Sequence, residues 1–245
     1  MMRTYLRTEI LRVLRNRRYV ILALAVPVGF YLLFGKLGDD GRAVRGTGVT
    51  SFFMVSMAAY SAMLAVLFMG GARLAAERAG GWTRLLRVTP LPSWGYLAVK
   101  ALAAMAIALP SILLVGATGF IAGPVRLGAG AWAELVLLMW LGTLPFAALG
   151  VVIGYLFDAD TAQPVTVVSA LVLSLLGGMW IPTARMPDTM RQIAHLLPGY
   201  HLADLGWRAV AGQAPVLADG LVLLAYGAAF AALAVWRYRR DEARA

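Results

Sequence analysis

The stretch GGARLAAERAGGWTRLLRVTPLPSWGYLAVK, residues 70–100, is a polar segment between two long apolar runs. The chain around it is 61% hydrophobic and 14% charged, whereas charged residues make up about a quarter of an ordinary soluble domain. Crossing a bilayer takes about 20 mainly apolar residues. The uncharged intervals of suitable length are 19–35, 46–72, 101–125, 135–157, 161–184 and 220–236. The sequence therefore predicts an all-α integral membrane protein with six transmembrane helices, in which residues 71–99 connect the second and third.

The first 18 residues carry six arginines and an apolar stripe, with Leu6, Ile10, Val13 and Leu14 on one helical face. This pattern predicts an amphipathic interfacial helix over residues 1–18 that lies on the membrane surface. A cleaved signal peptide is the alternative, but the Ala-Leu-Ala triplet at 23–25 follows too short an apolar core. We therefore expect the first apolar interval to remain as an anchor, within a single transmembrane domain over residues 1–245.

The basic residues are distributed unevenly between the two sides of the predicted bundle. Fifteen of the 22 lysines and arginines fall in residues 1–18, 73–100 and 237–245, and seven fall in the other connections. Because basic residues concentrate on the cytoplasmic side of membrane proteins, we expect both termini and residues 71–99 in the cytoplasm. The net charge of +10 then reports orientation in the plasma membrane and contact with anionic lipids, and nucleic-acid binding is not needed to explain it.

Residues 185–216 predict a helical hairpin on the outer side, before the last span. Pro187 and Asp188 suit a helix start, and Pro198-Gly199 breaks that helix before a second one begins. We expect this hairpin to be re-entrant, dipping into the outer leaflet. Two helices that only rest on the membrane surface are the alternative.

Four residues in and before the hairpin are candidates for an outer opening of a substrate path: Met179, Trp180, Tyr200 and Trp207. Aromatic and flexible apolar side chains offer adaptable contacts to an amphipathic molecule. Simple anchoring at the membrane interface is the alternative role for each of them.

The sequence lacks the motifs of several chemistries. It has no phosphate-binding G-x-x-x-x-G-K-[ST] loop, no H-E-x-x-H zinc motif, no G-x-S-x-G nucleophile motif and no cysteine. His195 and His201, six residues apart, are interpreted as ordinary polar residues of the hairpin rather than metal ligands or a pH switch. We therefore expect no catalytic residue, metal or cofactor on this chain, which weakens the alternatives of an ion-coupled carrier or an integral membrane enzyme.

Within residues 71–99 the polar segment divides into two predicted helices. Arg73 and Glu77 have the i, i+4 spacing of a helical ion pair. Gly80-Gly81 interrupts this helix, and residues 82–89 again have helical apolar spacing until the Thr-Pro-Leu-Pro corner at 89–92. The segment therefore predicts a short helix held crosswise below the membrane between two corners.

The run ERAGGWTRLLRVTPL, residues 77–91, resembles the cytoplasmic signature of permease subunits of type-2 ATP-binding-cassette exporters. The matching residues are Glu77, Arg78, Gly81, Leu86, Arg87, Val88, Thr89, Pro90 and Leu91. The resemblance extends over nearly the whole chain, from the basic N-terminal helix to the segment before the last span. Trp82 and Arg84 depart from the usual pattern, in which a small hydroxyl residue and then an acidic residue follow the glycine, and this implies a more acidic partner surface.

The resemblance implies that residues 71–99 contain a coupling helix that docks on a separate cassette ATPase. The implied coupling residues are Glu77, Arg78, Gly81, Arg84, Leu85, Leu86, Arg87, Thr89 and Pro90. It further implies two ATPase subunits that bind ATP and Mg²⁺, a second permease protomer, and alternating access. The implied cargo is a drug-like, lipid or other amphipathic molecule, as in daunorubicin-type efflux permeases, with polysaccharide or glycolipid export as the alternative. On this view Glu77→Ala or Leu86→Asp should abolish transport and leave stability nearly intact.

Overall fold

The computed structural model describes residues 8, 17–37, 43–44, 47–81, 93–123 and 125–242. Most of the predicted interfacial helix over 1–18, and residues 82–92 of the predicted coupling segment, lie outside these residues. The described helices are α2 Arg17–Leu37, α3 Val49–Gly70, α4 Ala72–Ala79, α6 Ser93–Ala122, α7 Ala129–Gly142, α8 Leu144–Leu156, α9 Ala159–Leu176, α10 Asp188–Leu196, α11 Pro198–Val210 and α12 Leu217–Glu242. A 3₁₀ turn spans Thr183–Arg185, and the strands of the described part are the antiparallel pair β1 Ala43–Val44 and β2 Thr47–Gly48.

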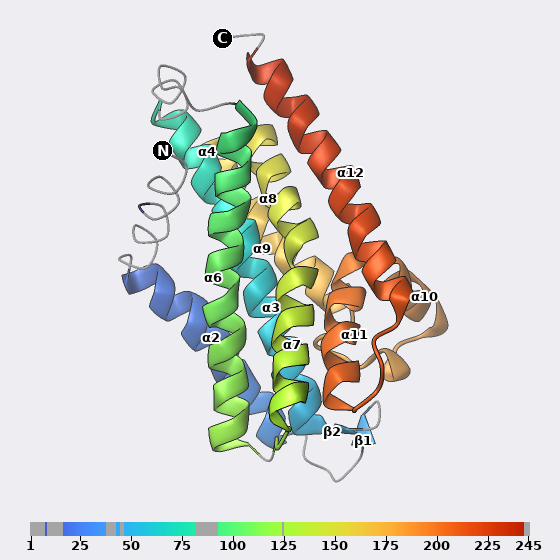
Figure 1. Cartoon of the computed structure of the whole chain (residues 1–245). Coiled ribbons are helices and arrows are strands. Elements are labelled where there is room, and N and C mark those ends of the chain that lie inside the picture. The colour runs from blue at the N-terminus through green and yellow to red at the C-terminus, as the bar shows by residue number, and fades with distance from the viewer. Residues whose placement is uncertain are drawn as a thin grey trace.

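The all-α membrane architecture predicted from the sequence is confirmed. Five stretches of the described part are long and apolar enough to cross a membrane: Val49–Ala79, Ala98–Ala122, Ala129–Leu156, Ala159–Leu176 and Leu217–Arg240. The first predicted interval lies in α2, whose described apolar part is Ala25–Gly35. Figure 1 shows these helices as a bundle in which α4 and the end of α12 lie towards one end, and the β1–β2 pair lies at the other.

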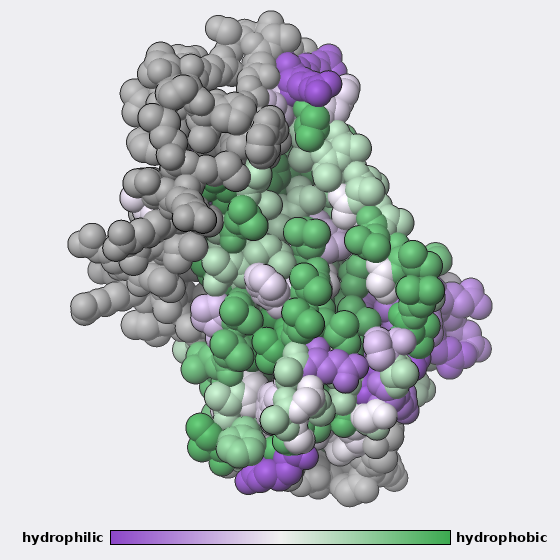
Figure 2. Space-filling view, in the orientation of Figure 1, coloured by the Kyte–Doolittle hydropathy of each residue, from purple (hydrophilic) through white to green (hydrophobic). Residues whose placement is uncertain are grey.

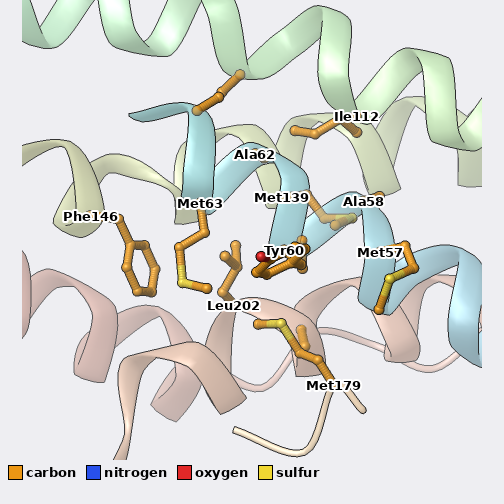
Figure 3. Packing of buried hydrophobic residues seen from close by; sticks show 14 of the residues in the cluster. Met57, Ala58, Tyr60, Ala62, Met63, Ile112, Met139, Phe146, Met179 and Leu202 are labelled. Atoms are coloured by element: carbon orange, nitrogen blue, oxygen red, sulfur yellow. The ribbon is translucent and has the colours of Figure 1, made fainter. Parts of the chain in front are cut away.

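Helix α3 forms the centre of the bundle. Eighteen of its 22 residues are buried, and Figure 3 shows its Met57, Tyr60 and Met63 among side chains from the surrounding helices. Close approach depends on glycine, because a Cβ on Gly70 would lie 2.7 Å from the backbone carbon of Gly150 in α8. Small residues at such contacts let membrane helices pack backbone to backbone.

Two predicted spans differ in detail from the structure. The interval 135–157 is divided at Thr143 into α7 and α8, because Pro145 has no backbone N–H to continue the helical ladder and stands at the start of the second helix. The second span does not end near residue 72, because α4 continues it to Ala79 after an interruption at Gly71. Part of the predicted coupling segment therefore belongs to the bundle.

The outer surface of the bundle is largely apolar. Large exposed side chains include Val168 and Val172 of α9 and Leu221 and Leu224 of α12. Figure 2 shows apolar residues over much of the described middle of one face, with polar residues beside α10 and near the end of α12. A soluble protein rarely exposes so large an apolar area, whereas a bilayer provides an apolar solvent for it.

Candidate functional site

A buried ion pair joins the two helices that flank the predicted coupling segment. Lys100 Nζ of α6 lies 2.6 Å from Glu77 Oε2 and 2.7 Å from Glu77 Oε1 of α4. Lys100 is 1% exposed and Glu77 is 8% exposed. Such charges are found buried when they are paired, because desolvation of either one alone is costly. The helices before and after residues 80–92, α4 and α6, are therefore bonded directly to each other.

Helix α4 is also attached to the end of α8 through Arg78. Arg78 Nη1 donates to the Gly154 carbonyl oxygen at 2.8 Å, and its guanidinium lies 4.8 Å from the centre of the Tyr155 ring. Gly154 is in the last turn of α8, where carbonyl groups lack helical partners and a positive charge is favourable. The predicted pairing of Arg73 with Glu77 is confirmed at 3.5 Å.

The alanines of α4 lie on both its buried and its exposed sides. Ala72 and Ala75 are buried, but Ala76 and Ala79 are exposed. Leu74 is also buried, together with Glu77, because this side of α4 packs against α8 and α9. Glu77, an implied coupling residue, is thus part of the packed interior.

Gly81 ends this part of the segment, where the sequence predicts an interruption. Its φ is +73°, in the left-handed region that favours glycine, and its N–H donates to the Arg78 carbonyl oxygen at 3.1 Å. The remaining predicted coupling residues lie outside the described part: Arg84, Leu85, Leu86, Arg87, Thr89 and Pro90. Their roles stay predictions, and α6 begins after them at Ser93.

The four residues predicted to line an outer opening are packed rather than open. Met179, Tyr200 and Trp207 are 0%, 6% and 2% exposed, and Trp180 is partly buried. Trp207 stacks on Phe52 with ring centres 4.8 Å apart, and its Nε1 donates to Ser56 Oγ at 3.2 Å. These contacts fix α11 to α3, although Trp207 follows Ser56 by 151 positions and Phe52 by 155 positions in the sequence.

Trp180 extends these aromatic contacts to a later turn of α3. Its ring meets Phe30 of α2 at 5.1 Å and Tyr60 of α3 at 5.5 Å, and its Nε1 donates to Ser174 Oγ at 2.9 Å. In this conformation Trp180 joins α2 to α3 and Trp207 joins α11 to α3, and an opening between them would require these rings to separate.

Two apolar grooves lie elsewhere on the bundle. One, of about 400 Å³, lies between α3, α6 and α7 and includes Met54, Ile112 and Trp132. The other, of about 770 Å³, is bounded by α7, α8, α11 and α12 and includes Pro145 and Leu224. Neither is lined by the four predicted residues.

The hairpin contains a polar network that the sequence interpretation missed. Arg208 Nε lies 2.6 Å from Asp204 Oδ2, and this hydrogen bond raises the pKa of Arg208 above its ordinary value. His201 Nδ1 lies 2.6 Å from Asp219 Oδ1 at the start of α12. The first pair has i, i+4 spacing that could have signalled it, whereas the second depends on how α11 packs on α12. Among the described residues, no group of three or more His, Asp or Glu side chains could hold a metal ion.

Two comparisons with known proteins agree with each other. Residues 18–236 match the family model described as ABC-2 family transporter protein. The chain is also similar to the putative transport permease YvfS of Bacillus subtilis strain 168, with 34% identity over 239 residues, which cover 96% of each chain.

Proposed function

Since the chain belongs to the ABC-2 family of transporter proteins and is a transport permease of that type, we propose that it is the membrane subunit of an exporter driven by a separate ATPase. The buried pair of Glu77 and Lys100 supports this proposal most directly. It joins the helices before and after the segment that would receive the force of the ATPase. A flexible connection between two spans would need no such pair.

The contacts at the base of the segment suggest how a displacement would spread. Residues 82–92 would dock on the ATPase, and closure of the ATPase on ATP would push them. Because Glu77 ties α4 to α6 and Arg78 ties α4 to α8, the push would move these helices together instead of bending one loop. Cooperative movement of packed helices is the usual form of such transitions.

We propose two permease protomers with two ATPase subunits, with ATP and Mg²⁺ bound by the ATPases. The relative positions of two basic regions support a common cytoplasmic side. Arg78 of α4 lies over the Tyr155 ring, and Arg237 Nη2 of α12 lies 3.5 Å from the Tyr155 carbonyl oxygen. Both therefore lie at the same end of the bundle, as the basic-residue distribution predicts.

The proposed cargo is a drug-like, lipid or other amphipathic molecule that leaves the cytoplasm or the inner leaflet. The apolar lining of the two grooves supports this class, since apolar surfaces bind such molecules without hydrogen-bond partners. Polysaccharide or glycolipid export is the alternative within the same family.

Transport and ATPase capture with a Leu86→Asp variant test this function. An aspartate desolvated in an apolar cleft of the ATPase would cost several kcal/mol, enough to dissociate a micromolar contact. We expect normal membrane insertion, loss of ATPase co-purification and loss of ATP-dependent transport into vesicles. The matched control is Gln213→Asp, in the exposed connection between α11 and α12. Normal co-purification and transport with Leu86→Asp would contradict the proposal.

A further inference from the structure

His201 of α11 contacts one acceptor on each neighbouring helix of the hairpin region. Its Nδ1 lies 2.6 Å from Asp219 Oδ1 of α12, and its Nε2 lies 2.8 Å from the His195 carbonyl oxygen of α10. The imidazole is 7% exposed and Asp219 is 4% exposed. A single side chain thus links three helices, and it does so through both ring nitrogens.

The two contacts fix the number of protons in the dyad of His201 and Asp219. A carbonyl oxygen only accepts hydrogen bonds, so Nε2 carries a proton. A second proton must lie between Nδ1 and the carboxylate oxygen, because otherwise two lone pairs would face each other at 2.6 Å. A neutral imidazole has only one N–H. The dyad therefore holds two protons whenever both contacts are present.

We propose that His201 and Asp219 form a proton-binding site that clasps the α10–α11 hairpin to α12. With the second proton bound, His201 bonds to both helices. Once that proton leaves, the remaining N–H can serve either the His195 carbonyl or the Asp219 carboxylate. The clasp is therefore closed at lower pH and opens on one side as the pH rises through the titration of the dyad.

The charged groups around the dyad define its two states. Arg208 Nε lies 3.9 Å from Asp219 Oδ2, and Asp204 holds Arg208 in place. Arg208 therefore places a positive charge beside the carboxylate oxygen that does not face His201. Asp219 Oδ2 is buried and has no hydrogen-bond partner in the described part of the chain. When His201 becomes neutral, Arg208 remains as the cation beside Asp219.

The elements packed against α11 carry further titratable groups. The His195 ring of α10 stacks on the Tyr200 ring of α11, with ring centres 4.4 Å apart. Tyr226 of α12 donates its hydroxyl proton to the Leu196 carbonyl oxygen at 3.0 Å, which gives the hairpin a second link to α12 that does not need the dyad. From α3, α7 and α9 the titratable residues are Tyr60, Glu134 and Asp160; Tyr60 is buried, and Glu134 and Asp160 are exposed. Opening of the clasp therefore loosens the hairpin without detaching it.

The protonation of His201 can be measured directly, because the chain has only two histidines. We expect ¹⁵N-imidazole NMR of the full-length protein to show His201 with both nitrogens protonated at pH 5 and with one proton lost on the way to pH 9. A His195→Gln variant assigns the two sets of signals. A His201 ring that is neutral at pH 5, or one that keeps both protons up to pH 9, would overturn the proposal.

Hairpin mobility tests the clasp itself. A spin label on a single cysteine at the exposed position Gln192 of α10 can be introduced, since the chain has no native cysteine. We expect the mobile fraction of the label to rise between pH 5 and pH 9 in the otherwise unchanged protein. A label at Trp236, which is 52% exposed on α12, should show no such change. A Gln192 label with the same mobility at all pH values would contradict the clasp.

Two variants separate the dyad from other effects of pH. In Asp219→Asn the side-chain amide can donate to Nδ1 of a neutral His201 while Nε2–H still bonds to the His195 carbonyl, so label mobility should be low and independent of pH. In His201→Gln the titrating group is absent, and mobility should again not vary with pH. A rise in mobility with pH in either variant, as large as in the unchanged protein, would overturn the proposal. These outcomes do not depend on whether the chain works with an ATPase.

Discussion

At the level of single residues, the charges of α4 show how burial changes what a substitution does. Glu77 is 8% exposed and bonds to Lys100, which is 1% exposed. The expectation that Glu77→Ala leaves stability nearly intact treated Glu77 as a surface residue, and the structure overturns that premise. Removing one member of a buried ion pair costs about 3–5 kcal/mol, because the other charge loses the partner that offset its desolvation.

We expect Glu77→Ala to lower the melting temperature of the detergent-solubilised protein by many degrees, measured by differential scanning fluorimetry. The double variant Glu77→Met/Lys100→Met should recover most of this loss, since apolar replacement of both members of a buried pair is often neutral or stabilising. The double variant also tests coupling. If the pair transmits movement, transport should stay low although stability has returned; recovery of both would leave the pair a purely structural role.

Gly81 gives a second prediction at the residue scale. Its φ of +73° costs a residue with a Cβ about 1 kcal/mol. Gly81→Ala should therefore reduce stability slightly, while altering the direction in which residues 82–92 leave α4. We expect a larger relative loss of ATPase co-purification than of melting temperature. Gly212→Ala, at a φ of +66° after α11, is the matched control and should leave co-purification unchanged.

At the level of helices, local properties were predictable and contacts between helices were not. Apolar intervals located the five spans of the described part, because the requirement for an apolar helix in lipid acts on each helix separately. Pro187-Asp188 and Pro198-Gly199 located the starts of α10 and α11, because proline and glycine limit the backbone locally. The bond from Lys100 to Glu77 and that from Trp207 to Ser56 depend on which helices become neighbours. No spacing in the sequence encodes that choice.

The start of α9 provides a prediction at this scale. Asp158 caps the helix by accepting a hydrogen bond from the Thr161 backbone N–H at 2.8 Å, and this bond lowers the pKa of its carboxyl group. A lowered pKa in the folded state means that the cap stabilises the protein above the ordinary pKa of aspartate and loses this effect as the pH falls through the lowered value. Asp158→Ala should lower the melting temperature at pH 7 and remove this acid-dependent contribution. Asp158→Asn, which still caps, should keep more of the stability at pH 7 than Asp158→Ala. The contribution of its cap should not change as the pH falls, because the amide does not titrate.

At the level of the whole molecule, the arrangement of the ends supports one orientation in the membrane. Arg78 and Arg237 meet at Tyr155, while the β1–β2 pair lies at the opposite end of the bundle (Figure 1). The two basic segments therefore share a side whichever way the bundle is inserted. The positive charge of these two segments then favours their placement on the cytoplasmic side of the membrane.

Single cysteines report this orientation, since the chain has none of its own. We expect a cysteine at Gln192 to react with a membrane-impermeant maleimide in intact cells, and a cysteine at Arg239 to react only after permeabilisation. Both positions are exposed, so accessibility within the fold does not limit either reaction. The reverse pattern would show that the bundle is inserted the other way.

The central position of α3 has a consequence for biogenesis. Helix α2 precedes it in the chain, whereas α6, α8 and α9, which also pack against it, are synthesised later. Three of its hydroxyl groups do not depend on the later helices, because Ser56 and Ser61 donate to carbonyl oxygens of α3 itself and Thr50 donates to the Gly35 carbonyl oxygen of α2. In lipid an unsatisfied polar group costs several kcal/mol. These three groups therefore add no such cost while helix α3 resides among acyl chains, before the later helices assemble around it.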